Sequence, residues 1–77
     1  MSQYRRKYLL RLHQRAIPHV EFERNSKQAV AIITDIGKAG YAECVNFDGE
    51  VVDPSDPDAT WQITDAGEKF IGKHVSG

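Results

Sequence analysis

The sequence predicts a small α+β domain in which helices come first, a β-hairpin follows and a last helix closes the fold. Three observations lead to this prediction. Apolar residues recur at helical spacing before residue 40, alternating residues surround an Asp-Gly turn after it, and the strand-like stretch "TWQIT" runs directly into another helical pattern. Because the chain has 77 residues, 40% of them hydrophobic, we expect one domain over residues 1–77.

The first helix is expected over residues 2–16. Its apolar face holds Tyr8, Leu9, Leu12 and Ala16. Leu10 and Ile17 lie on another side, where they either pack against the following segment or begin a dimer seam. Packing is favoured because a small core draws residues from several sides.

The next stretch, "AIPHVEFERNS", has two interpretations. A short helix from Pro18 to Arg24 is expected because proline suits the first helical turn, where its missing N–H is not needed. In the alternative interpretation the segment is extended, with Val20 and Phe22 pointing the same way.

A third helix is predicted over residues 26–39, and both of its ends are marked. Ser26 caps the start, and Gly40 stops the helix because glycine readily takes the left-handed conformation that closes a helix. The inward face holds Ala29, Ile32, Ile33, Ile36 and Gly40. The opposite face carries a stripe at spacings of four, three and four residues, made of Lys27, Ala31, Thr34 and Lys38.

Residues 41–63 predict a β-hairpin around an Asp-Gly turn. One side of "YAECVNF" holds Tyr41, Glu43, Val45 and Phe47, and the other holds Ala42, Cys44 and Asn46. A short strand is expected at Val51 and Val52, after which two prolines mark a loop. In the returning strand, Trp61 and Ile63 share one face.

The last strand changes abruptly into the last helix. Thr64 offers its hydroxyl to the free N–H groups of the next turn, and Asp65 lies where the helix dipole favours a negative charge. Gly67 has no side chain to hold the helix away from its neighbours. The helix is expected to line one side with Gly67, Phe70, Ile71 and His74.

This order of helix, short helix, capped helix, hairpin and helix resembles the winged helix-turn-helix family of bacterial and phage transcription regulators. In that family an apolar residue, three spacers and a glycine lead from the recognition helix into the first wing strand, as "IGKAGYAE" does at residues 36–43. The second wing strand closes with hydrophobic-Thr-x-x-Gly, as "ITDAG" does at residues 63–67. The resemblance covers residues 4–74 and implies three helices, a two- or three-stranded β-hairpin wing and a C-terminal helix.

The resemblance implies double-stranded DNA as the partner and a role in transcription regulation, in a protein of phage or bacterial origin. The helix at residues 26–39 would enter the major groove. The residues expected to face DNA are Arg24, Lys27, Gln28, Ala31, Thr34 and Lys38. Ala31 and Thr34 permit close approach and a methyl contact with thymine, and the lysines reach phosphates or guanine edges. The arginines of the first helix are expected to add phosphate contacts.

Charge is divided unevenly along the chain. Residues 1–28 carry a net +5, from seven basic and two acidic residues, and residues 29–77 carry a net −6, from three basic and nine acidic residues. Five of the acids fall in the expected wing: Asp48, Glu50, Asp53, Asp56 and Asp58. Because these acids oppose phosphates, the wing is expected to point away from bound DNA. In the alternative hypothesis the protein is a winged-helix interaction module, an inhibitor or adaptor, whose acidic wing binds a basic partner surface.

Other kinds of site lack their residue patterns. The acidic loop has a proline where a calcium loop needs a ligand, and the three histidines and the single cysteine lack zinc-ligand spacing. We expect no catalytic, metal or cofactor site, and we interpret Cys44 as a buried, inert thiol. The chain shows neither a signal peptide nor a membrane span, so a cytoplasmic protein without membrane contact is expected. A homodimer would have to use the first or the last helix.

Overall fold

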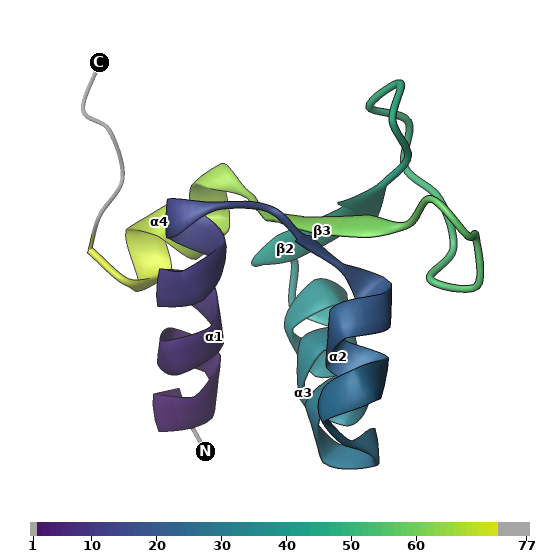
Figure 1. Cartoon of the computed structure of the whole chain (residues 1–77). Helices are drawn as coiled ribbons and strands as arrows, with labels where there is room; N and C mark the ends of the chain where they lie inside the picture. The colour runs from purple at the N-terminus through teal and green to yellow at the C-terminus, as the bar shows by residue number, and fades with distance from the viewer. Residues whose placement is uncertain (1, 73–77) are drawn as a thin grey trace.

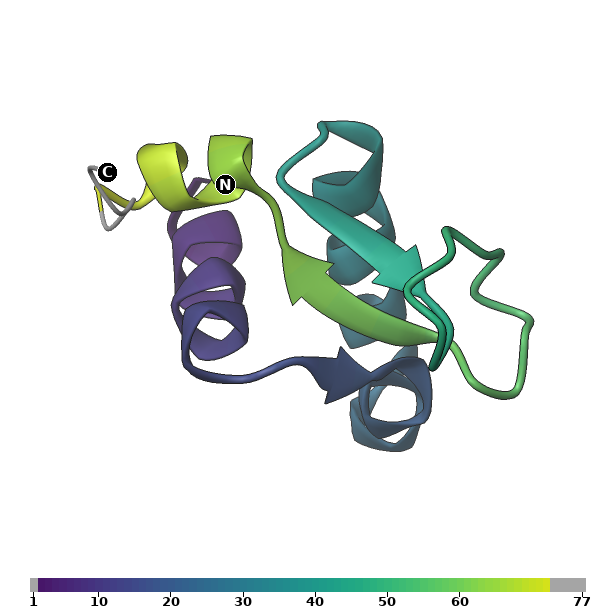
Figure 2. The same ribbon diagram turned by 90° about the horizontal axis from the view of Figure 1, so that it is seen from above.

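The computed structural model of this protein describes residues 2–72. Within them the chain forms four helices and one three-stranded antiparallel sheet, an α+β domain. The elements in chain order are α1 (Ser2–Gln14), β1 (Ile17–Pro18), α2 (His19–Asn25), α3 (Lys27–Lys38), β2 (Ala42–Val45), β3 (Thr60–Ile63) and α4 (Asp65–Phe70). α1 and α4 lie at one end of the sheet, and the loop between β2 and β3 extends from the other end (Figures 1 and 2).

The sheet has the order β1-β3-β2, so the last strand in the sequence is the central one. Trp61 of β3 is paired with Cys44 on one side and with Ile17 on the other. The predicted short helix is confirmed, with a start at His19 in place of Pro18, and the extended interpretation is wrong, because Val20 and Phe22 lie in α2 with Val20 exposed and Phe22 buried. The chain is extended at Ile17–Pro18 and turns helical at His19, after Pro18 at φ −60° and ψ 142°. A proline fits this point because it suits both an edge strand and a helix start.

The prediction for the end of the first helix was wrong by two residues. α1 ends at Gln14, and Ala16 is exposed instead of lying on the apolar face with the buried Tyr8, Leu9 and Leu12. The chain leaves the helix here because the residue before a proline is disfavoured in the helical region. Ile17 is consequently extended and buried, and Leu10 packs against the core, which confirms packing over a dimer seam for these two residues.

The predicted caps of α3 are confirmed, and so is its inward face except for Gly40, which lies beyond the helix end and is exposed. The Ser26 hydroxyl accepts a hydrogen bond from the Ala29 backbone N–H at 3.0 Å, and Gly40 follows the helix with φ +86°. Ala29, Ile33 and Ile36 are buried, and Ile32 packs at the edge of the core. α3 is thereby fixed in rotation, with one face against α1, α2 and the sheet.

Thr64 ties two corners of the chain together. Its hydroxyl accepts from the Gly67 N–H at 3.1 Å, as the cap prediction required, and donates to the Gly40 carbonyl at 2.7 Å. Its own N–H donates to the Tyr41 carbonyl at 3.1 Å. The turn that leaves α3 and the turn that enters α4 are thus joined directly.

Two glycines permit close approach of elements at these corners. A Cβ on Gly67 would overlap the Tyr41 carbonyl oxygen and would lie 2.7 Å from Ile63 Cγ1. A Cβ on Gly37 would lie 2.8 Å from two ring carbons of Trp61. The sequence predicted that Gly67 permits such an approach. Gly37 was not predicted in this role, and it lets the Trp61 indole lie directly against α3.

The core is centred on Leu9, Ile33 and Ile36, which are fully enclosed between α1, α3 and the sheet. Tyr8 stacks on Phe22 with ring centroids 5.8 Å apart, joining α1 to α2. Trp61 is 4% exposed, and its indole N–H donates to His19 Nδ1 at 3.0 Å. This bond satisfies a polar group that would otherwise be buried without a partner.

The prediction of a strand at Val51 and Val52 is wrong, and the predicted face of α4 is confirmed for the residues that the structure describes. Val51 and Val52 do not form a strand; Val51 makes a single antiparallel bridge to Val45. The Asp-Pro repeats that follow stop further pairing because proline cannot donate to a ladder. The expected face of α4 is confirmed for Gly67 and Ile71, which are buried, and for the partly buried Phe70. His74 lies outside the described residues.

We predict that Gly67→Ala destabilises the fold by about 2 kcal/mol or more, because the added methyl group forces α4 away from Tyr41. The free energy of unfolding from urea denaturation measures the effect. Ala66→Ser, at the neighbouring exposed position of α4, is the control and should stay within about 0.5 kcal/mol of the wild type. Equal stabilities for the two variants would contradict the close-packing argument.

We predict that His19→Leu costs about 1–3 kcal/mol, because it leaves the buried Trp61 N–H without an acceptor. In a double-mutant cycle, Trp61→Phe should then cost less in the His19→Leu background than in the wild type, since no donor remains to be satisfied. Chemical denaturation of the four proteins gives the coupling energy. A coupling energy of zero would mean that the hydrogen bond contributes nothing to stability.

Candidate nucleic-acid interface

The predicted outer stripe of α3, defined as Lys27, Ala31, Thr34 and Lys38, lies away from the core. Lys27, Ala31 and Lys38 are exposed, and Thr34 is partly exposed. Within residues 2–72 neither lysine forms an ion pair. The stripe is therefore a line of short side chains with an unneutralised positive charge at each end.

Arg24 and Gln28 extend this surface near the start of α3. Arg24 lies in the last turn of α2 and is exposed, and one capping residue, Ser26, separates α2 from α3. Arg24 and Lys27 therefore lie on either side of the α3 N-terminus, where backbone N–H groups lack intrahelical partners. Gln28 is exposed beside them. All six residues predicted for this site are thus on the α2–α3 unit.

An acid that the sequence reasoning missed lies on α3 itself. Asp35 is exposed and projects from the same helix as the stripe, where a carboxylate would repel phosphates. The Arg5 guanidinium donates to Asp35 Oδ2 from Nε at 3.0 Å and from Nη2 at 2.8 Å. The Arg5 guanidinium also lies 5.8 Å from the centre of the Tyr41 ring. No local pattern signals this pair because the partners are 30 residues apart.

The arginines of α1 are less available than the sequence predicted. Arg5 is paired with Asp35, and Arg6 donates to the Ile71 carbonyl at 3.1 Å. Arg15, just after the helix, pairs with Glu21 at 3.3 Å. Arg11 is exposed, and within the described residues it forms no ion pair. The α1 arginines thus join elements of the fold as well as carrying charge.

The first part of the β2–β3 loop (residues 46–59) is a tight turn organised by Asn46. Its side-chain carbonyl accepts from the N–H groups of Asp48 at 2.9 Å and of Glu50 at 3.0 Å. Its side-chain amide donates to the Glu50 carboxylate at 3.1 Å, and its backbone N–H donates to the Glu50 carbonyl at 2.9 Å. Asp48 and Glu50 are therefore held on an ordered turn and are exposed.

The second part of the loop uses its acids to build two successive turns. Asp53 Oδ1 accepts from the Ser55 N–H at 3.0 Å, and Asp56 Oδ1 accepts from the Asp58 N–H at 2.8 Å. The hydrogen bond from the Ser55 backbone, aided by one from its side chain, lowers the pKa of Asp53. These carboxylates thus stabilise the backbone of the loop, which is a structural reason for the Asp-Pro repeats.

Phe47 and Val51 are exposed on this loop, and the sequence reasoning did not single them out. Phe47 was predicted to share a side of the strand with Val45, but β2 ends at Val45 and Phe47 is 83% exposed. Val51 is 73% exposed. Hydrophobic alternation indicates which residues share a face within a strand, but it does not indicate where the strand ends. The alternating pattern therefore did not predict that Phe47 lies beyond β2.

A shallow, largely apolar groove of about 310 Å³ separates the end of α3 from the β2–β3 loop. Its lining includes Thr34 and Lys38 of α3, Val51 and Val52 of the loop, and Trp61 of β3. Cys44 also borders the groove, and its thiol is buried, as predicted. Burial raises the pKa of Cys44, and the negative charges of Asp53 and Asp56 raise it further, against a smaller opposing hydrogen bond at Thr60.

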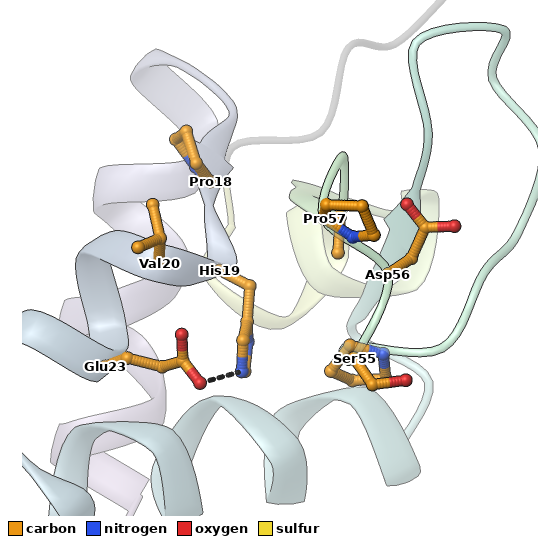
Figure 3. A pocket seen from close by; sticks show the side chains of 9 residues that line it. Pro18, His19, Val20, Glu23, Ser55, Asp56 and Pro57 are labelled. Carbon is orange, nitrogen blue, oxygen red and sulfur yellow. Dashed lines mark ion pairs between the residues drawn. The ribbon is translucent and has the colours of Figure 1, made fainter.

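A second pocket, of about 220 Å³, lies between the start of α2 and the Asp-Pro repeats. Figure 3 shows His19 and Glu23 on the α2 side, facing Ser55 and Pro57 across the opening. Because Trp61 donates to His19 Nδ1, the neutral imidazole carries its proton on Nε2, the atom that lies 3.8 Å from Glu23. A metal ion at Nε2 would have to displace that proton, which disfavours metal binding here.

The described part of the chain offers neither a cluster of metal ligands nor a membrane-spanning helix. Residues 2–72 contain no group of three or more His, Cys, Asp or Glu side chains arranged to hold a metal ion. None of the helices in this range has the length and apolar character that crossing a membrane requires.

Comparisons with known proteins add no relative to these observations. No protein-family model, no curated protein and no solved structure matches the chain. The functional proposals that follow therefore rest on the residues, on their geometry and on the resemblance described above.

We predict that Cys44 reacts slowly with a thiol reagent such as Ellman's reagent in the folded protein. The raised pKa keeps the thiolate fraction low at neutral pH, so the reaction rate should keep rising with pH beyond the range of an ordinary thiol. A Cys44→Ser, Ser55→Cys protein, with its thiol on the exposed loop, is the control and should react faster. Equal rates for the two folded proteins would contradict the predicted protection.

Proposed function

We propose that this protein is a small winged-helix DNA-binding protein that acts as a transcription regulator of phage or bacterial type. The observation that supports this most strongly is the outer stripe of α3, which is exposed on a helix whose ends and rotation are fixed. Ser26 and Gly40 define its ends, and the buried Ile33 and Ile36 define its inner face. A fixed helix that presents short side chains between two lysines is suited to the major groove.

The proposed contacts divide by chemistry. Lys27, Arg24 and the free N–H groups at the start of α3 would hold backbone phosphates, which position the helix without reading sequence. Ala31 and Thr34 would lie against base edges, where their methyl groups can contact thymine. Lys38 would reach a phosphate or a guanine, and the exposed amide of Gln28 is suited to adenine. Arg5 would limit repulsion from Asp35 by neutralising it.

The β2–β3 loop would take the place of the wing in this proposal, directed away from DNA. Figure 1 shows the loop projecting beyond the sheet, whereas the N-terminal half of α3 lies on the other side of the sheet. Asp48, Glu50 and Asp58 are exposed on the loop, and phosphates would repel them. Contact would thus be confined to the α2–α3 surface and neighbouring basic residues, and the loop would border that surface at the groove beside Thr34 and Lys38.

Fluorescence anisotropy with a mixed-sequence duplex, repeated across a salt series, tests the proposal. The logarithm of the binding constant should fall linearly with the logarithm of salt concentration, by about 0.9 for each phosphate contact. No binding at low salt would contradict the proposal. A steep slope would justify selection of a preferred sequence from a random duplex pool.

The residues are tested with Lys27→Glu/Lys38→Glu, which should abolish measurable binding because both charged ends of the stripe are reversed. Lys7→Glu/Lys69→Glu is the matched control, since it changes two exposed lysines on α1 and α4 and gives the same net charge. This control should retain most of the affinity. Equal losses in both proteins would indicate a general charge effect, and retained binding by the first variant would refute the site assignment.

A further inference from the structure

The two most exposed large hydrophobic side chains in the described chain both belong to the β2–β3 loop. Phe47 is 83% exposed and Val51 is 73% exposed, whereas Tyr4 and Val20, the next two, are 47% and 46% exposed. Leaving an aromatic ring in water gives up the free energy that its burial would contribute, about 1.5–3 kcal/mol. Such residues mark binding sites when they are grouped and held in place.

Phe47 is held in place by the backbone around it. The Asn46 side chain bonds to both Asp48 and Glu50, and the Gly49 N–H donates to the Asn46 carbonyl at 3.1 Å. Gly49 has φ +82°, a conformation that other residues rarely adopt. On the far side of the turn, Val51 is bridged to Val45 of β2. The aromatic ring therefore projects from an ordered turn, which lowers the entropy cost of burying it against another molecule.

The charges around these two side chains indicate what kind of surface covers them. Asp48 and Glu50 lie in the same turn as Phe47, and Asp53 and Asp58 are exposed farther along the same loop. The sequence contains no lysine or arginine between Lys38 and Lys69. The two apolar side chains thus lie on a loop whose negative charges no basic residue of the loop neutralises.

We propose that the tip of the β2–β3 loop docks on a partner protein that has an apolar pocket with a basic rim. Phe47 enters the pocket, Val51 packs at its edge, and Asp48 and Glu50 pair with Lys or Arg on the rim. Complementary charge speeds the encounter and fixes orientation, and the buried ring supplies most of the affinity. The inference goes beyond DNA binding and does not depend on it, because it uses a different part of the molecule.

Two other occupants fit the loop poorly. Phosphates of nucleic acid or of an anionic membrane would be repelled by the same carboxylates that favour a basic protein. A symmetric dimer through the loop would place two copies of Asp48 and Glu50 against each other. A basic protein surface satisfies both the apolar and the charged parts of the loop tip.

A displayed library of random peptides is selected for binding to the purified protein, and the enriched sequences serve as the probe. We expect the enriched peptides to combine an apolar residue with flanking Lys or Arg, and fluorescence anisotropy of labelled synthetic copies to give their affinities. Phe47→Ser should weaken binding at least tenfold. Asp48→Asn/Glu50→Gln should weaken it less and should flatten its salt dependence.

The control is Tyr4→Ser, which removes an exposed aromatic side chain from α1 and should leave peptide affinity unchanged. Circular dichroism of each variant verifies that the fold is intact, which is expected because Phe47 contributes little buried area. The proposal is overturned if no peptide is enriched, if enriched peptides lack basic residues, or if Phe47→Ser binds them as the wild type does.

Sedimentation analysis over a concentration series tests whether a second copy of this chain binds the loop tip. We expect that the wild-type protein does not associate through the loop, so its sedimentation coefficient should depend on concentration in the same way as that of Phe47→Ser. Self-association that Phe47→Ser abolishes would identify another copy of the chain as the occupant and would overturn the proposal of a basic partner. Each of these outcomes is independent of the DNA titrations, which use the α3 variants.

Discussion

The fold depends on a direct link between the two corners that Thr64 joins. The side chain and backbone of this one residue reach Gly40, Tyr41 and Gly67, so the exit of α3 and the entry of α4 share their hydrogen bonds. Gly67 makes the link geometrically possible because any side chain there would meet the Tyr41 carbonyl. Each of these hydrogen bonds contributes about 0.5–1.5 kcal/mol, which is a sizeable share of the stability of a domain this small.

The molecule has a part that is held by several elements and a loop that projects from the sheet (Figure 1). α3 is held at its start by Ser26, along its length by α1 and α2, and at its end by Gly40. The β2–β3 loop extends from the opposite end of the strands and is stabilised mostly by its own hydrogen bonds. A change at the loop tip can therefore leave the α3 surface unaltered, which suits the two contact surfaces proposed above.

The sequence predicted those parts of the fold that depend on local chemistry. Ser26, Gly40 and Thr64 have the predicted roles because a cap or a helix stop is defined within four residues. The β1–β3 pairing and the Arg5–Asp35 bond were missed because their partners are far apart in the sequence and carry no periodic signal. The stripe on α3 could be predicted from helical spacing alone. The exposure of Phe47 could not, since it depends on where β2 ends.

Trp61 gives this domain a built-in optical reporter. It is the chain's only tryptophan, and its indole is buried against Gly37 of α3, paired across the sheet with Cys44 and hydrogen-bonded to His19 of α2. One fluorophore thus contacts α2, α3 and both neighbouring strands. Its emission spectrum follows the packing of the sheet on α3 without any label, so the native state can be monitored while either surface is occupied.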